Sequence, residues 1–303
     1  MKIICVGRNY AEHAAELGDD PPTEPLLFGK FDNTLIGPGE TIVLPPEATH
    51  VDAEAELAVE IGRAGHRIAE DDALAHVRGY RCANDVSARN LQYSDSQWAR
   101  AKGFDTFCPL GKELVPVAEL GDGSGLRVVQ RLNGEVLQDG STSDLIFSVP
   151  HLVAFISNVF TLEPGDLILT GTPPGVGWAR DPKVSLKPGD IVEVEVEGIG
   201  VVRNPVANYS AGSRAASSAS EWPPSAATTV SATAHSFSGA RPGGDTRRGD
   251  RSEAVSRLHS EHARLNPHGP ARVSAHSFST LVTTAAARPG WKRRDRAGER
   301  SVS

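Results

Sequence analysis

The chain has 303 residues, of which 39% are hydrophobic and 23% are charged, so it can bury one large core or two ordinary ones. Residues 1–207 hold 17 Lys and Arg against 31 Asp and Glu, whereas residues 208–303 hold 14 against 7. The acidic balance of the first part argues against a nucleic-acid-binding surface there.

Short apolar runs predict several strands in the first third of the chain. Residues 2–6, 26–30 and 41–45 have the composition of strands, and residues 10–17 suit a short helix that ends at Gly18. The acidic, proline-rich stretch between this helix and the second strand is expected to be a loop. Residues 52–62 alternate charged or small residues with larger apolar ones, which is the two-residue period of a strand.

The following segments continue this pattern of short elements. Residues 70–80 suit a helix, residues 82–88 a strand that enters a turn, and residues 149–160 a helix. Residues 161–177 read as a strand followed by a glycine-rich loop, and residues 186–206 as a hairpin that turns near Gly198. Many short strands with few helices predict an α+β, β-rich protein built on a rolled or barrel-like sheet. Because strands and helices do not alternate, a doubly wound parallel sheet is disfavoured.

The composition changes after Ala207, where Ser, Ala, Thr, Arg, Gly and Pro begin to dominate. A loose repeat relates residues 231–243 to residues 274–290, but no apolar face accompanies it. The sequence therefore predicts a folded domain over 1–207 and a low-complexity, disordered basic tail over 208–303. Translation of DNA that does not normally encode the C-terminus is an alternative origin for this tail.

The cysteines and the N-terminal segment indicate where in the cell the protein is expected. Cys5, Cys82 and Cys108 are widely spaced in apolar surroundings, which favours reduced, buried thiols over a disulfide framework. The apolar run after Met1 is too short for a signal peptide or a membrane span. We therefore expect a cytoplasmic protein with no membrane partner.

Three carboxylates stand out as candidate metal ligands. Glu54 and Glu56 are two residues apart on a predicted strand, so their side chains share a face and their charges repel. A solvated strand face would explain this pair alone. Asp85, however, lies at a strand end in apolar surroundings, and polar residues follow it. Three carboxylates without a His or Cys cluster suit a hard ion, Mg²⁺ or Mn²⁺, which a 2-oxo acid chelates through its carboxylate and keto oxygens.

Six blocks of the sequence, in the same order, resemble the signature blocks of the fumarylacetoacetate hydrolase family. They span nearly all of 1–207 and comprise GRNYAEH (7–13), DAEAELAVEIG (52–62), ANDVSARNLQ (83–92), QWARAKGFDTFCPLG (97–111), SDLIFSVPHLVAFIS (143–157) and TLEPGDLILTGTPPGVG (161–177). The resemblance is to the compact single-domain members, which include acylpyruvate hydrolases and oxaloacetate decarboxylases. It implies a mixed β-roll with a few peripheral helices, a homodimer and a Mg²⁺ or Mn²⁺ centre, with ligands at Glu54, Glu56 and Asp85.

The resemblance also implies catalytic residues. His13 and Glu16 share one face of the predicted helix, where a carboxylate can orient an imidazole that activates water. In the family such a pair lies on a lid that orders over bound substrate. Lys102 matches the lysine that faces the metal and stabilises a developing oxyanion.

Substrate contacts are expected from the same blocks. Arg89 and Gln92 match polar residues that line the family's cavity. The loop that contains Thr172 resembles the family's site for the substrate carboxylate, which its backbone N–H groups and the Thr172 hydroxyl would bind.

These residues favour hydrolysis of a C–C bond in an acylpyruvate or related β-diketo acid, a reaction type of aromatic catabolism. His13 with Glu16 would deprotonate the attacking water, and Lys102 would stabilise the developing charge. Decarboxylation of oxaloacetate and isomerisation of a 2-hydroxyhepta-2,4-diene-1,7-dioate-type diacid need the same residues and stay open. A non-catalytic metal-binding relative is a further alternative.

Overall fold

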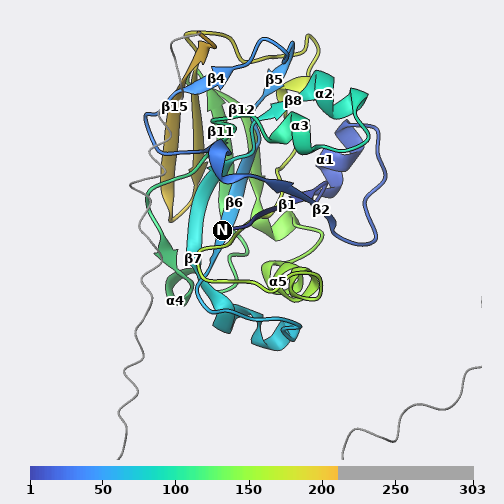
Figure 1. The fold of residues 1–303 in the computed structure, drawn as a ribbon, viewed down its shortest axis with the longest axis vertical. Helices are drawn as coiled ribbons and strands as arrows, with labels where there is room; N and C mark the ends of the chain where they lie inside the picture. The colour runs from blue at the N-terminus through green and yellow to red at the C-terminus, as the bar shows by residue number, and fades with distance from the viewer. Residues whose placement is uncertain (211–303) are drawn as a thin grey trace, which may run out of the picture. The chain divides into compact units, whose positions relative to one another are not determined.

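Strands make up most of the regular structure in the computed structural model, which describes residues 1–210 (Figure 1). The strands are β1 Ile3–Gly7, β2 Leu26–Lys30, β3 Leu35–Ile36, β4 Ile42–Leu44, β5 Val51–Asp52, β6 Ala55–Ile61, β7 Val77–Asn84, β8 Ser87–Ala88, β9 Cys108–Pro109, β10 Val115–Pro116, β11 Arg127–Leu132, β12 Glu135–Ser141, β13 Leu167–Leu169, β14 Ile191–Val196 and β15 Gly200–Asn208. The α-helices are α1 Ala11–Glu16, α2 Arg89–Ser94, α3 Ala99–Lys102, α4 Val117–Leu120 and α5 Val149–Ser157. Short 3₁₀ turns span Asp32–Thr34, Glu70–His76, Thr142–Asp144 and Gly177–Ala179.

The strands form two main sheets. One has six strands in the order β10-β7-β6-β13-β1-β2, and the other has five in the order β12-β11-β14-β15-β4. The pairs β1–β13 and β15–β4 are parallel, whereas the other neighbours within these sheets are antiparallel. The predicted α+β, β-rich class is confirmed, because the chain forms mixed sheets with few helices. The regular alternation of strands and helices that defines a doubly wound fold is not seen in residues 1–210.

The largest hydrophobic core lies between the two sheets and under α5. It takes Leu57, Val59 and Ile61 from β6 and valines from β11, β14 and β15. Ala58, on the opposite face of β6, joins a smaller core with Cys5 and Leu169. Because successive strand residues point to opposite faces, Glu56 shares the Ala58 face and points away from the largest core.

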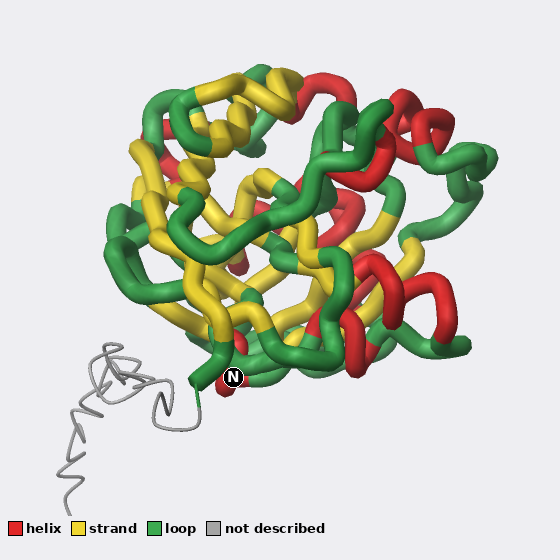
Figure 2. Tube along the Cα trace, turned by 90° about the horizontal axis from the view of Figure 1, so that it is seen from above, coloured by secondary structure: helices red, strands yellow, loops and turns green. Residues whose placement is uncertain are grey.

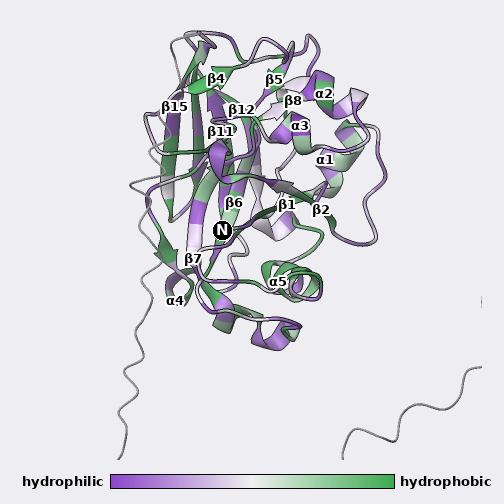
Figure 3. Cartoon of the chain, in the orientation of Figure 1, coloured by the Kyte–Doolittle hydropathy of each residue, from purple (hydrophilic) through white to green (hydrophobic). Residues whose placement is uncertain are grey.

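Helices α1, α2 and α3 gather beside the sheets, on the same side of the molecule (Figure 1). Seen from above, most helical segments lie to one side of the strands (Figure 2). The β14–β15 hairpin shows the alternation expected of a two-sided sheet, because its residues alternate between buried and more exposed and Val alternates with Glu in β14. Along β15, hydrophobic and hydrophilic residues follow one another in short stretches (Figure 3). The turn of the hairpin contains Gly198, as predicted.

Two local predictions need correction, and one hairpin has no counterpart among the predicted elements. The strand predicted over 52–62 is interrupted at residues 53–54, since β5 pairs with β8 whereas β6 pairs with β7 and β13. The helix predicted over 70–80 is a 3₁₀ turn only to His76, and β7 begins at Val77 because pairing with β6 takes over there. The β11–β12 hairpin was not predicted at all, although Asn133-Gly134 at its turn is a strong hairpin signal.

Cys5, Cys82 and Cys108 are buried and free, as the sequence predicted. No helix within residues 1–210 is long and apolar enough to cross a membrane. The tail predicted from residue 208, with its loose repeat, lies outside the described residues except for its first three positions, and β15 ends at Asn208.

Candidate active site and metal centre

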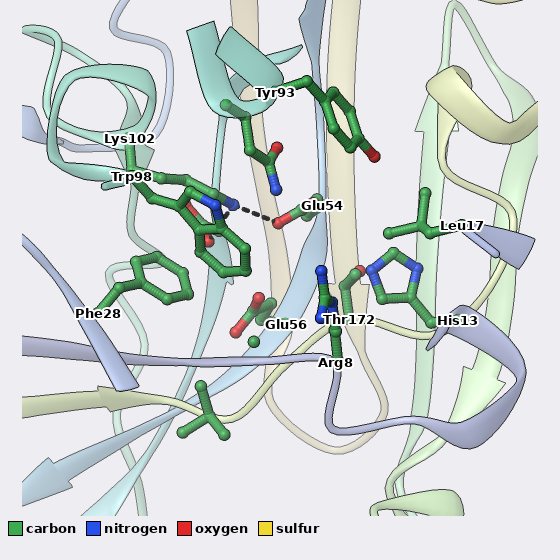
Figure 4. A pocket seen from close by; sticks show the side chains of 14 residues that line it. Arg8, His13, Leu17, Phe28, Glu54, Glu56, Tyr93, Trp98, Lys102 and Thr172 are labelled. Atoms are coloured by element: carbon green, nitrogen blue, oxygen red, sulfur yellow. Dashed lines mark hydrogen bonds and ion pairs between the residues drawn. The ribbon is translucent and has the colours of Figure 1, made fainter. Parts of the chain in front are cut away.

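A cavity of about 170 Å³ opens between the six-stranded sheet and helices α1 to α3. Seven of the nine predicted site residues line it, namely His13, Glu54, Glu56, Asp85, Gln92, Lys102 and Thr172. Figure 4 shows Glu54 and Glu56 in the middle of the cavity, with Lys102 on one side and His13 on the other. The remaining walls come from Val6, Gly7, Arg8, Leu17, Phe28, Tyr93 and Trp98.

The three predicted metal ligands form one cluster. Glu54, Glu56 and Asp85 are all buried, and one carboxylate oxygen from each lies within 4.8 Å of the others. Strand pairing brings them together, because Glu56 is opposite Ala83 in the β6–β7 register and Asp85 N–H donates to the Glu54 carbonyl at 2.9 Å. The sheet therefore joins carboxylates that are about thirty positions apart in the sequence.

Basic side chains surround two of the three carboxylates. The Lys102 Nζ donates to Glu54 Oε2 and to Asp85 Oδ2, both at 2.7 Å, and Lys30 Nζ donates to Asp85 Oδ1 at 2.6 Å. The Arg89 guanidinium lies 2.7 Å from Glu54 Oε1. Glu56 differs, because none of the ion pairs within residues 1–210 includes it and its Oε2 accepts a hydrogen bond from Gly171 N–H at 2.7 Å.

This asymmetry separates the pKa values of the carboxyls. Burial raises the pKa of Glu56 well above its usual value, and the charges of Asp85 and Glu54 raise it further. Burial would also raise the pKa of Glu54, but the charges of Lys102 and Arg89 outweigh it and lower that pKa. Burial alone would lower the pKa of Lys102, whereas Asp85 and Glu54 raise it above its usual value. The amine therefore stays charged beside them.

The cluster fits a hard divalent cation. Its donors are carboxylate oxygens, which Mg²⁺ and Mn²⁺ prefer, and they come from the paired strands β6 and β7 and the residues next to their ends. The raised pKa of Glu56 indicates negative charge that the neighbouring bases do not neutralise and that a cation would offset. Glu54, Glu56 and Asp85 are therefore the residues that could hold such an ion.

Helix α1 carries the predicted His–Glu pair to the edge of the cavity. His13 is buried, and its Nδ1 lies 2.7 Å from Glu16 Oε1. The second oxygen, Glu16 Oε2, accepts a hydrogen bond from Gly175 N–H at 2.8 Å. Glu16 thus orients the imidazole and also attaches α1 to the glycine-rich loop.

The glycine-rich loop binds carboxylates of the protein itself. The N–H groups of Gly171, Gly175 and Gly177 donate to Glu56, Glu16 and Asp52 respectively. The sequence had suggested that such groups would bind a substrate anion. Only glycine suits position 171, because its φ is 103° and a Cβ there would lie 2.8 Å from the Asn9 Cβ.

The three predicted substrate contacts, Arg89, Gln92 and Thr172, differ in their access to the cavity. Gln92 lines the cavity, whereas the Arg89 side chain is fully buried behind it and is held by Asp52, Glu54 and Gln92. Thr172 also lines the cavity, but its hydroxyl already donates to the Ala55 carbonyl and accepts from Gln138. Among these residues, Gln92 has the clearest access to a ligand.

Lys30 and Asp52 belong to the site, although the sequence does not single them out. Lys30 is the last residue of β2, and its side chain is completely buried against Asp85. The sequence feature that could have indicated this role is a lysine at the end of an otherwise apolar strand. Asp52 accepts hydrogen bonds from Arg89, Gly177 and Trp178, so it supports the site from behind. Only the tertiary structure brings these partners together.

Comparisons with known proteins agree with this architecture. The family model described as fumarylacetoacetate hydrolase C-terminal matches residues 2–207. The mitochondrial oxaloacetate tautomerases FAHD2A of Bos taurus and Homo sapiens are each 48% identical over 207 residues, which is 68% of this chain. The chain spans 66% of the length of these curated relatives.

Solved structures with the same fold are named for different enzyme activities. The 5-carboxymethyl-2-hydroxymuconate delta-isomerase of Mycobacterium smegmatis is 44% identical, with a TM-score of 0.62 over 69% of this chain and 79% of that one. The fumarylpyruvate hydrolase of Pseudomonas aeruginosa, in complex with Mn²⁺ and pyruvate, is 31% identical, with a TM-score of 0.63 over 69% of this chain and 90% of that one.

Proposed function

The chain belongs to the fumarylacetoacetate hydrolase family of enzymes, and on that premise we propose that it is a divalent-metal-dependent tautomerase of 2-oxo acids such as oxaloacetate. The observation that carries this proposal is the position of two groups across one small cavity. The carboxylate cluster of Glu54, Glu56 and Asp85 lies on the sheet, and the His13–Glu16 pair lies on α1.

Glu54, Glu56 and Asp85 would hold Mg²⁺ or Mn²⁺. When bound, the ion would supply Lewis-acid polarisation of the 2-oxo carbonyl and charge neutralisation for the carboxylate beside it. The oxygen donors suit both Mg²⁺ and Mn²⁺, and the name of the Pseudomonas aeruginosa relative records Mn²⁺ for that protein.

The protein's own residues account for proton transfer and orientation. His13, oriented by Glu16, would take a proton at its Nε2 from the carbon next to the 2-oxo group, and protonation of the enolate oxygen would then give the enol; the reverse transfers would give the keto form. The charged Lys102 Nζ would stabilise negative charge that develops on the substrate oxygen. Gln92 would hydrogen-bond the substrate, Thr172 would pack against it, and Arg89 would hold Glu54 in place.

Hydrolysis of an acylpyruvate, which the sequence favoured, is the second candidate. It is supported by the fumarylpyruvate hydrolase named above and by the His13–Glu16 pair, which suits water activation as well as proton transfer. We rank tautomerisation first because the curated relatives at 48% identity bear that name. Decarboxylation of oxaloacetate is an outcome that the same assay separates, whereas diacid isomerisation is tested with a 2-hydroxyhepta-2,4-diene-1,7-dioate-type substrate.

The test follows the enol absorbance of oxaloacetate with Mg²⁺ or Mn²⁺, with EDTA as the control, and analyses the products by NMR. EDTA-sensitive equilibration without loss of oxaloacetate supports the tautomerase. Pyruvate formed with CO₂ would indicate decarboxylation instead. Pyruvate and acetate formed from acetylpyruvate would indicate hydrolysis.

Variants connect the activity to the site. Glu56→Ala and the isosteric Glu56→Gln should lower metal affinity and turnover by about 100-fold or more, because they remove a ligand. His13→Gln should lower turnover by about 10²–10⁴-fold and leave metal affinity unchanged. Glu12→Gln, an exposed carboxyl on the same helix, is the matched control. Near-normal turnover by Glu56→Ala would refute the metal assignment.

The oligomeric state and location belong to the same proposal. The family resemblance supports a homodimer, which size-exclusion chromatography with light scattering would detect. The names of the two tautomerases place those proteins in mitochondria, whereas composition led us to expect the cytoplasm. Fractionation of the source cells would decide between them.

A further inference from the structure

Arg8 is a charged residue in the wall of the cavity that none of the roles above uses. It directly follows β1 and precedes α1, so it lies between the sheet and the helix that carries His13. Its φ of 58° is in the left-handed region, which is uncommon for a residue other than glycine. Figure 4 shows its side chain reaching into the cavity between Glu56 and His13.

Packing on both sides fixes the backbone that presents Arg8. A Cβ at Gly7 would lie 2.8 Å from the Trp98 ring, so the indole covers this turn closely. On the other side, the Asn9 side chain donates to the carbonyls of Thr170 at 2.8 Å and Phe147 at 3.0 Å. The guanidinium is therefore presented from a turn that is held in place before any ligand arrives.

The donors of Arg8 are only partly used. Within residues 1–210 its guanidinium makes one ion pair, in which the NH2 group lies 2.9 Å from Asp19 Oδ2, and both side chains are about one-third exposed. Its Cζ lies 5.9 Å from the centre of the Trp98 ring. Arg89 contrasts with it, because that guanidinium is fully buried and bonded to Asp52, Glu54 and Gln92. Arg8 thus retains N–H groups for a ligand in the cavity.

We propose that Arg8 binds the distal carboxylate of a 2-oxo dicarboxylic acid, so that the enzyme prefers diacids to acylpyruvates whose distal group is uncharged. This inference rests on the proposed function, in which the 2-oxo end of the substrate lies at Glu54, Glu56 and Asp85. A planar guanidinium matches a carboxylate through paired N–H donors. Leu17, Phe28 and Trp98 add apolar side chains to the cavity wall.

The first measurement is independent of turnover. Calorimetry in the presence of Mg²⁺ compares malate with 2-hydroxybutanoate, which has a methyl group in place of the distal carboxylate. Wild-type protein should bind malate at least about 10-fold more tightly, the range for a charge-assisted hydrogen bond. Arg8→Gln should bring the ratio close to one, and Arg8→Lys should keep part of it.

Asp19→Asn is the matched control, because it breaks the same ion pair from outside the cavity. This variant should keep or increase the preference for malate, since it frees the guanidinium. Wild-type protein without a preference, including one that binds neither acid, would overturn the proposal. The proposal would also be overturned if the preference for malate persisted in Arg8→Gln. It would likewise be overturned if Asp19→Asn abolished the preference as completely as Arg8→Gln does.

Turnover separates this proposal from the proposed function. In steady-state assays, Arg8→Gln should raise the KM for oxaloacetate about 10-fold or more, with a smaller change in kcat and little effect on the 4-ethyl ester of oxaloacetate. If the malate preference depends on Arg8 but oxaloacetate is not turned over, the proposed function fails and the Arg8 site stands. If turnover is present but Arg8→Gln affects acid and ester equally, only the Arg8 assignment fails.

Discussion

At the scale of single residues, ion pairs set the charge of the site and so affect both its stability and its chemistry. Lys102 is buried, and its amine contacts both Glu54 and Asp85, so it neutralises two prospective metal ligands and also faces the cavity. A lysine in this position has a structural effect and a chemical one. Removing one partner of a buried pair leaves the other charge without compensation.

Lys102→Met tests both effects. Without metal, the variant should be less stable than wild type by about 3–5 kcal/mol, because the Glu54 and Asp85 charges lose their shared partner. Added Mg²⁺ should restore much of this stability, while turnover stays about 10²–10³-fold lower because the oxyanion donor is missing. Urea unfolding with and without Mg²⁺ measures the first effect. Lys112→Met, at an exposed position, is the control, and equal stability of the two variants would contradict the charge-pairing account.

At the scale of elements, hairpin turns and strand registers determine where the site residues lie. The β11–β12 hairpin turns through Asn133 and Gly134, which both have positive φ, at 54° and 85°. This conformation matches the twist of the flanking strands and favours Asn-Gly. The hairpin in turn carries Gln138, which bonds to Ala55 N–H next to Glu54 and to the Thr172 hydroxyl.

Gly134→Ala should therefore lower the free energy of unfolding by about 1–2 kcal/mol. A Cβ at this position meets no atom within 4 Å, so the loss would come from the backbone conformation alone. Gly29→Ala in β2 is the control, because its φ is not positive and its Cβ would make only an ordinary contact at 3.7 Å. Urea unfolding of both variants measures the difference, and equal stability would show that the turn conformation carries no strain.

At the scale of the whole molecule, the fold buries all three thiols, which predicts that they are unreactive in the native protein. Burial raises the pKa of Cys82 and of Cys108 to about 12, and it raises that of Cys5 well above the usual value. Since the thiolate is the reactive form, native protein at pH 8 should not react with iodoacetamide. Raising the pH to 9 should change this little, because the pH stays far below these pKa values. Mass spectrometry should detect labelling only after unfolding in urea, and rapid labelling of native protein would contradict the burial.

The three hydrophobic cores and the cavity all lie between Ile3 and Val206. We therefore expect a chain that stops after Ser210 to keep the melting temperature and the kcat/KM of the full chain. Thermal unfolding and the oxaloacetate assay of the two proteins would test this. A large loss on truncation would show that residues beyond 210 contribute to the folded domain or to catalysis.

Local patterns of residues predicted the β-rich class, many of the strands and the candidate metal ligands Glu54, Glu56 and Asp85, because two-residue alternation and polar residues at strand ends can be recognised from neighbouring positions. These patterns did not separate the 3₁₀ turn before Val77 from a helix, since pairing between β6 and β7 decides where that strand begins. The tertiary structure alone decided that Lys30 pairs with Asp85, that Arg89 lies behind Glu54 and that Arg8 faces the cavity. These contacts join residues far apart in the chain, and their partners depend on sheet register and packing, which no local pattern of residues specifies.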